Sequence, residues 1–146
     1  DVRALCASVA ERRGKPIQLV GLATGSEVLG MWVATDVADL IFYEQITTRP
    51  HQDHIILHEL SHLLCDHYPV ISMDISALTP NLDPEMVRRV LARTTYQEAE
   101  EQEAELLASL IQNRAHQLSL AHQDGETVLD ERLDSAFVNP WTPRRG

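Results

Sequence analysis

Basic side chains are scarce in this sequence, which has 12 Lys and Arg against 22 Asp and Glu and a net charge of −10. Lys15 is the single lysine, and the arginines are scattered along the chain instead of forming a stripe. Proteins that bind nucleic acids normally present a basic surface to the phosphates. We therefore expect no direct nucleic-acid partner.

Cysteines and long apolar runs are scarce as well. The 2 cysteines, Cys6 and Cys65, are too few for a disulfide framework. No stretch approaches the roughly 20 apolar residues of a membrane span, and no segment has the pattern of a signal peptide. These absences predict a cytoplasmic protein without a membrane partner.

The 146 residues, 44% hydrophobic and 23% charged, suffice for one globular domain with a hydrophobic core. Apolar residues at helical spacing predict helices over residues 2–13, 54–67, 83–93 and 96–122. Further apolar segments predict strands over residues 17–20, 28–34 and 40–43, the last two antiparallel. We therefore expect an α+β fold, with a domain over residues 1–125 and a polar C-terminal tail over residues 126–146.

Local signals mark the expected helix ends. Gly14 follows the first predicted helix and is expected to stop it. Asp83 followed by proline predicts the start of the third helix. Thr95 and Glu98 are expected to form a capping box at the start of the last helix.

The most informative segment is the pentad His58-Glu59-Leu60-Ser61-His62, which lies inside a predicted helix. Histidines at positions i and i+4 lie one turn apart on the same helical face, so both imidazoles can reach one metal ion. Glu59 lies about a quarter turn away, where it can take a proton from water without being a ligand. The surrounding residues are apolar, and burying two imidazoles and a carboxylate without a metal would be costly. The pentad therefore predicts a zinc site.

A third protein ligand is expected from the acidic run that begins the last helix. At about 100° per residue, Ala104, Ala108 and Ala115 fall within about 60° of Glu101, Glu105 lies about 40° away, and Glu103 lies about 160° away. A strip of alanines lets another helix approach closely. Glu101 and Glu105 are therefore expected on the face that meets the two histidines, with Glu103 on the far side.

Together these two segments resemble the ImmA/IrrE family of bacterial metallopeptidases. The pentad with Leu63 and Leu64 is similar to the family's HELGHLLL helix, and residues 101–108 (EQEAELLA) are similar to its later ExEANxFA helix. The resemblance covers residues 1 to about 115. It implies a zincin-like metallopeptidase fold, in which a small antiparallel or mixed sheet of about three strands packs against the pentad helix and a long C-terminal ligand helix.

The resemblance also implies the site residues. His58, His62 and Glu101 would hold one zinc ion per chain, and Glu59 would act as the general base. Glu105 would make an outer hydrogen bond to a ligand histidine. Two features depart from the family: Leu107 replaces the usual Phe, and the segment over residues 66–95 is long, so we expect a reshaped or covered substrate cleft.

The implied activity is metal-assisted hydrolysis of a peptide bond inside the cell. Glu59 would remove a proton from water and later deliver it to the leaving amine. Tyr96 and His67 are candidates for a hydrogen-bond donor to the oxyanion, although spacing alone does not aim them at the metal. The implied substrate is a regulatory protein such as a helix-turn-helix repressor.

Two other functions remain open from the sequence. The chain fits a metal-binding regulatory or toxin–antitoxin partner with little or no peptidase activity. It also fits a structural zinc domain, which would need a fourth protein ligand such as Cys65 or His67. The intact Glu59 favours the enzyme, because a purely structural site has no use for a base.

Overall fold

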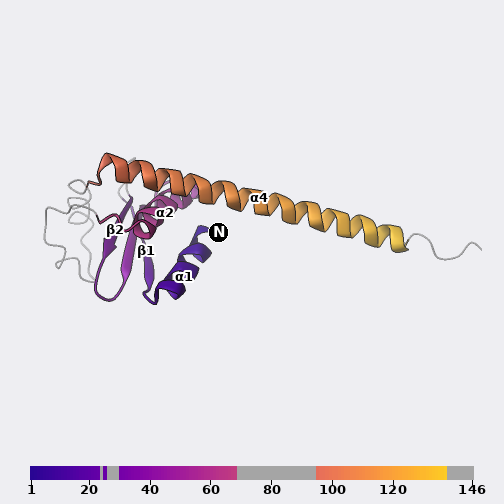
Figure 1. Ribbon diagram of the computed structural model, residues 1–146, viewed down its shortest axis with the longest axis horizontal. Helices are drawn as coiled ribbons and strands as arrows, with labels where there is room; N and C mark the ends of the chain where they lie inside the picture. The colour runs from indigo at the N-terminus through magenta and orange to yellow at the C-terminus, as the bar shows by residue number, and fades with distance from the viewer. Residues whose placement is uncertain (24, 26–29, 69–94, 138–146) are drawn as a thin grey trace, which may run out of the picture. The chain divides into compact units, whose positions relative to one another are not determined.

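The computed structural model describes residues 1–23, 25, 30–68 and 95–137, with side chains described up to residue 122. This part of the chain contains three helices and three strands, so its class is α+β, as predicted (Figure 1). The chain forms two compact units, residues 1–108 and residues 109–146. The helix predicted over residues 83–93 lies outside the described residues.

The three strands form one mixed sheet in the order β1-β3-β2. β1 (Ile17–Leu22) runs parallel to the central β3 (Asp39–Glu44), and β2 (Gly30–Ala34) runs antiparallel to β3. The predicted antiparallel pair is therefore confirmed. The strands begin or end one or two residues away from the predicted positions, at the ends where apolar patterning is least informative.

The core of residues 1–108 lies between the sheet and the pentad helix. α2 (Arg49–Leu64) packs against β2 and β3, while α1 (Val2–Arg13) packs against β1 and α2 (Figure 1). The largest fully buried apolar side chains come from these strands and from α2: Trp32, Phe42, Met31, Ile41, Ile56, Leu60 and Leu63. Ile56, Leu60 and Leu63 belong to the pentad helix, so its predicted burial is confirmed.

α1 has a capping residue at each end. The Asp1 carboxylate accepts a hydrogen bond of 2.9 Å from the Arg3 amide, which satisfies one free amide of the first turn. Gly14 follows the helix with a φ of 66°, a left-handed conformation that glycine adopts without steric cost. The predicted stop at Gly14 is confirmed. The Arg3 guanidinium also bonds Asp53 at 2.8 Å, which links α1 to α2.

α2 begins at Arg49, so the start predicted at residue 54 is wrong. Pro50 lies in the first turn, where the amide that proline lacks would have no partner within the helix. The carbonyl of Thr48 accepts a hydrogen bond from the Gln52 amide at 2.9 Å, which completes the first turn. Pro50 thus belongs to the first turn of α2.

α2 ends at Leu64, not at His67 as predicted, in a turn that folds the chain back on its last residues. Asp66 has a φ of 55°, and its amide lies 3.3 Å from the Leu63 carbonyl oxygen. The His67 amide donates to the His62 carbonyl at 3.0 Å. This is the Schellman pattern, with aspartate at the position where glycine is usual. The turn places His67 directly beside His62.

α4 (Glu98–Phe137) begins two residues after the predicted start and extends well beyond the predicted end at residue 122. It continues through Gly125, so the predicted polar tail is helical as far as Phe137. The Glu100 carboxylate accepts a hydrogen bond of 2.9 Å from the Gln97 amide. The cap predicted at Thr95 and Glu98 therefore lies two positions further on. The division into a domain over residues 1–125 and a tail stays a prediction.

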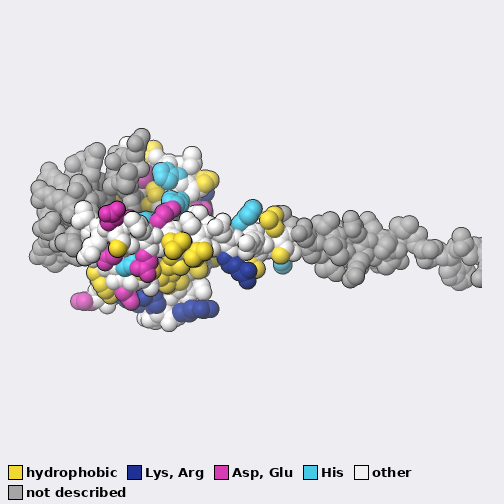
Figure 2. Space-filling model, turned by 45° about the horizontal axis from the view of Figure 1, so that its top comes forward, with side chains coloured by type: hydrophobic (Ala, Val, Ile, Leu, Met, Phe, Trp, Pro, Cys, Tyr) yellow, Lys and Arg dark blue, Asp and Glu magenta, His cyan; other side chains and the backbone are white. Residues whose placement is uncertain are grey.

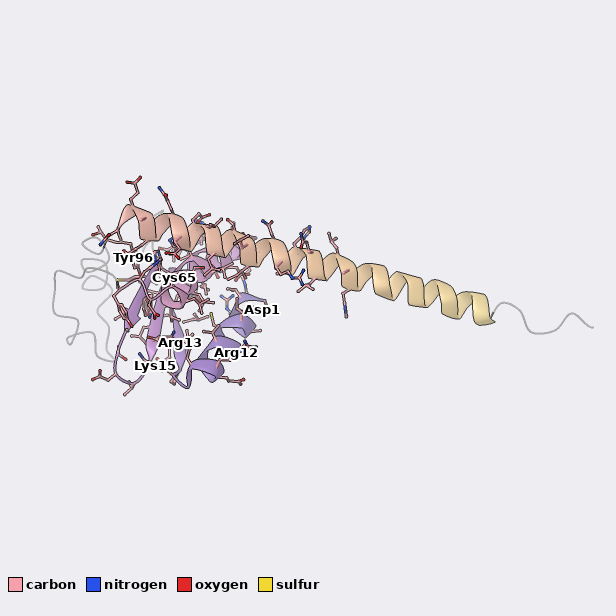
Figure 3. The ribbon with its side chains drawn as sticks, in the orientation of Figure 1. Asp1, Arg12, Arg13, Lys15, Cys65 and Tyr96 are labelled. Atoms are coloured by element: carbon pink, nitrogen blue, oxygen red, sulfur yellow. The ribbon has the colours of Figure 1, made fainter. Side chains whose placement is uncertain are left out.

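Asp39 is a fully buried carboxylate at the start of β3. Its Oδ1 accepts hydrogen bonds from Lys15 Nζ at 3.0 Å and from the Trp32 indole at 3.2 Å, and Arg13 Nη2 lies 4.0 Å from its Oδ2. Arg13 and Lys15 stand together at the end of α1 (Figure 3). Because a buried charge is tolerated only with partners of this kind, the cluster fixes the end of α1 to the sheet.

We expect Asp39→Ala to lower the free energy of unfolding by about 2–3 kcal/mol, because it leaves the buried Trp32 N–H without its acceptor and Lys15 without its carboxylate. Urea denaturation measures the loss. Asp36→Ala, on the exposed turn just before β3, is the matched control and should change stability by less than about 0.5 kcal/mol. Equal losses in the two variants would contradict a structural role for Asp39.

Candidate metal centre

Three donor atoms from α2 and the first turn of α4 converge on one point. The Nε2 atoms of His58 and His62 lie 3.1 Å apart, and Oε2 of Glu101 lies 3.1 Å from the first and 3.7 Å from the second. Ligands held about 2.0–2.1 Å from a tetrahedral ion are separated by about 3.3 Å. The observed triangle therefore has the size of a zinc coordination shell. The structure brings together the three residues that the sequence predicted as ligands.

The opposite nitrogen of each histidine ring is also occupied. Nδ1 of His58 lies 3.3 Å from Oε2 of Glu105, and Nδ1 of His62 lies 3.1 Å from Nδ1 of His67. The outer contact predicted for Glu105 is thus present. A neutral imidazole carries one proton, so a ring that donates from Nδ1 presents a lone pair at Nε2. Two lone pairs and a carboxylate oxygen then face one another, an arrangement that a cation stabilises.

His62 is the most enclosed member of this set. Its side chain is fully buried, and the Tyr96 ring stacks on it at 3.6 Å between centroids with an angle of 6°. Burial, assisted by His58 and His67, lowers the pKa of His62 to about 3. The ring is therefore neutral at physiological pH, as a metal ligand must be.

The Glu59 side chain is buried and follows His58 directly on α2. Its Oε2 accepts a hydrogen bond of 3.3 Å from the Tyr96 hydroxyl, and the backbone amide of Trp32 on β2 also bonds it. Burial raises the pKa of Glu59 from 4.5 to about 8, the Trp32 amide opposes this shift, and the charge of Glu101 adds to it. The carboxyl group of Glu59, the predicted base, is thus held against β2, where it feels the charge of Glu101.

Gly30 makes room for the Glu59 carboxylate. A Cβ atom on Gly30 would lie 2.5 Å from Oε1 of Glu59 and 2.8 Å from Cγ2 of Ile55. Both distances are shorter than atoms tolerate, so any larger residue would displace the strand or the carboxylate. β2 can approach α2 this closely at Glu59 because position 30 has no side chain. Nothing in the sequence pattern had singled out this glycine.

Tyr96 is one of the two residues directly before α4, and Figure 3 labels it at the start of that helix. Its hydroxyl lies at Glu59, and its ring covers His62. Burial and the carboxylate of Glu59 raise the pKa of Tyr96, so the phenol stays protonated and can donate. Of the two donor candidates from the sequence, Tyr96 is therefore the one at the centre.

His67 lies on the other side of the His62 ring. Its Nδ1 meets Nδ1 of His62, and its Nε2 lies 3.0 Å from Oε2 of Glu103. This position does not suit the oxyanion role proposed from the sequence, because the His62 ring separates His67 from the converging donors. It instead makes His67 the outer hydrogen-bond partner of a ligand histidine, and Glu103 the partner of His67.

Helical geometry predicted most of the α4 face correctly. Ala104 and Ala108 are fully buried beside Glu101, while Ala115, expected on the same strip, is exposed. Glu103 was expected on the far side, yet its carboxylate contacts His67. Glu103 points away from α2, as the helical spacing predicts. His67, however, lies beyond the end of α2, where the Glu103 carboxylate can reach it. Figure 2 shows acidic and histidine side chains near one another on the surface of the unit formed by residues 1–108.

Comparison of the chain with protein-family models, with curated proteins and with solved structures finds no match. Among the described residues, no helix combines the length and the apolar character that crossing a membrane requires.

We expect the contribution of Glu59 to the stability of the metal-free protein to fall as the pH rises from about 5 to 8. Its folded-state pKa of about 8 lies above its ordinary value of 4.5, so the folded protein retains a proton that the unfolded chain has lost. Glu59→Gln removes this effect. With a chelator present, urea denaturation should show the free energy of unfolding of the variant rising relative to that of the wild type as pH rises, by about 4 kcal/mol at pH 8. Glu98→Gln, an exposed change on α4, should show no such trend. A constant difference for Glu59→Gln would refute the buried, protonated carboxyl.

Proposed function

We propose that this chain is a zinc-dependent intracellular peptidase with a zincin-like fold, as the resemblance to the ImmA/IrrE family implies. The observation that carries the proposal is the convergence of His58 Nε2, His62 Nε2 and Glu101 Oε2 within 3.7 Å of one another, with Glu59 buried beside them. A two-histidine, one-glutamate set with an adjacent glutamate is the donor pattern of a catalytic zinc site.

The donor set fits zinc in number and in protonation. Glu105 and His67 accept or share the Nδ1 protons, so both ligand rings offer Nε2 to the ion. Bound zinc supplies Lewis-acid chemistry: it polarises the scissile carbonyl and makes water more acidic. The same three side chains leave a fourth position for substrate and water, as hydrolysis requires.

A structural zinc site is the less favoured function, because neither proposed fourth ligand lies at the centre. His67 contacts the outer nitrogen of His62, on the side away from the converging donors. Cys65 lies with His67 and Glu103 in a separate cluster. A buried glutamate next to three ligands has no purpose in a structural site, whereas in a peptidase it has a specific task.

Glu59 is proposed as the general base. Its carboxylate is held by the Trp32 amide and the Tyr96 hydroxyl, so its orientation is fixed before substrate binds. A cation at the three ligands favours the ionised form of this buried carboxyl. The ionised Glu59 accepts a proton from water and then returns it to the leaving amine. The Tyr96 hydroxyl is protonated and lies at the Glu59 carboxylate. It is the proposed hydrogen-bond donor to the developing oxyanion.

The proposed substrate is a regulatory protein such as a helix-turn-helix repressor. This part of the proposal rests on the family resemblance alone, since a fold or a metal site does not specify a substrate. The net charge of −10 agrees with a protein partner and not a nucleic-acid partner.

The purified protein is expected to bind about one zinc ion at the His58–His62–Glu101 centre. Glu101→Ala removes one of three ligands and should weaken binding there by at least about 100-fold. Calorimetric zinc titration after chelator treatment measures the change, with Glu98→Ala as the exposed control on the same helix. If both variants retain wild-type affinity, Glu101 is not a ligand.

Glu59→Gln is expected to keep the zinc ion but to reduce peptide hydrolysis by at least about 1,000-fold, because the amide cannot accept the water proton. The zinc-loaded protein is incubated with a proteome-derived peptide library, and mass spectrometry counts new termini. Cleavage that persists in Glu59→Gln would rule out the proposed base. Zinc binding without cleavage by the wild type would instead favour the metal-binding regulatory partner.

A further inference from the structure

A second group of metal-ligating side chains lies where the Schellman turn of α2 meets α4. The donor atoms of Cys65, His67 and Glu103 all lie within 4.8 Å of one another. His67 is buried and its Nε2 is 3.0 Å from Oε2 of Glu103. Cys65 is half-buried at the end of α2, where Figure 3 labels it. The peptidase mechanism uses none of these three atoms.

We infer that Cys65, His67 and Glu103 form a second site for a thiophilic divalent cation of the zinc class. A thiolate, an imidazole and a carboxylate together select zinc-like ions over magnesium or calcium. Burial, together with the negative charges of Glu103 and Asp66, raises the pKa of the Cys65 thiol. A cation would offset these charges. Movements of about 1 Å would bring the three atoms to the spacing of a tetrahedral shell.

A hydrogen bond between the rings of His62 and His67 joins the second site to the first. Only one proton lies between Nδ1 of His62 and Nδ1 of His67, which are 3.1 Å apart. When His62 binds a cation through Nε2, its Nδ1 carries this proton and His67 accepts it. When His67 binds a cation through Nε2, the proton must be on His67, and His62 then carries its own proton on Nε2.

The two sites therefore oppose one another. Filling both leaves two N–H groups directed at each other in a buried position, which costs a hydrogen bond and adds a repulsion. An ion bound at Cys65, His67 and Glu103 thus weakens the binding of an ion at the first centre. An ion at the first centre weakens binding at the second site in the same way. This opposition, unlike the second site itself, rests on the proposed metal centre at His58, His62 and Glu101.

The second site is tested with Co²⁺ as a probe, because a cysteine thiolate bound to cobalt gives a charge-transfer band in the near ultraviolet. The full chain with His58→Ala and Glu101→Ala lacks the first centre. We expect it to bind one Co²⁺ with the thiolate band. Adding Cys65→Ser should abolish the band, whereas adding Cys6→Ser, which changes the buried thiol of α1, should leave it intact. Circular dichroism checks that each variant is folded.

Absence of the thiolate band in the folded double variant, or its survival after Cys65→Ser, overturns the second site. If the double variant does not fold, wild-type protein with excess Co²⁺ decides in the same way through Cys65→Ser. The opposition between the two sites is tested by the Co²⁺ concentration at which the thiolate band reaches half its full intensity. This concentration should be at least about tenfold higher for the wild-type protein than for the double variant. Equal midpoints would overturn the opposition and leave the second site standing. Failure of the peptidase proposal would appear in the Glu59→Gln and Glu101→Ala experiments instead.

Discussion

The hydrogen bonds to the outer nitrogens of His58 and His62 are the contacts on which the centre depends. Two imidazole rings one turn apart on a buried helix can rotate and exchange tautomers unless something fixes them. Glu105 fixes His58, and His67 fixes His62, so both rings present the same kind of atom to the same point. Glu101 then completes the set from α4. The geometry of the centre thus depends on residues that would not touch a bound ion.

The sheet supports this centre from the other side. β2 approaches α2 at Gly30, and the amide of Trp32 bonds the Glu59 carboxylate while its indole bonds Asp39. Trp32 therefore connects the buried charge that fixes α1 to the buried acid beside the donor atoms. Both carboxyl groups accept a hydrogen bond from this strand residue; Lys15 supplies a further bond to Asp39, and Tyr96 supplies a further bond to Glu59.

Much of the centre was predictable because it follows from helical periodicity. The spacing of the pentad predicts two histidines on one helical face. The alanine strip of the last helix predicts that Glu101 and Glu105 lie on the face that meets them. What periodicity could not supply is the path of the chain where a helix ends. The left-handed Asp66, the return of His67 and the consequent role of Glu103 depend on a turn that aspartate seldom makes. Gly30 was missed because its role is a close approach between elements distant in sequence. The bounds of α2 and α4 were wrong where proline and glycine, usually read as breaks, lie inside the helices.

Glu101, Glu103 and Glu105 lie on one continuous helix, α4, so their directions around the helix axis are fixed relative to one another. Inserting or deleting a single residue between Tyr96 and Glu105 rotates every later carboxylate by about 100° around the helix axis. Such a change would misdirect at least one of the contacts to His58 and His67, and both of them when it lies before Glu101. The same change beyond Ala108 would leave all of them in place. Variation in length is therefore expected to be forbidden over these ten positions and tolerated beyond Ala108, a pattern that gene sequences of related chains would record.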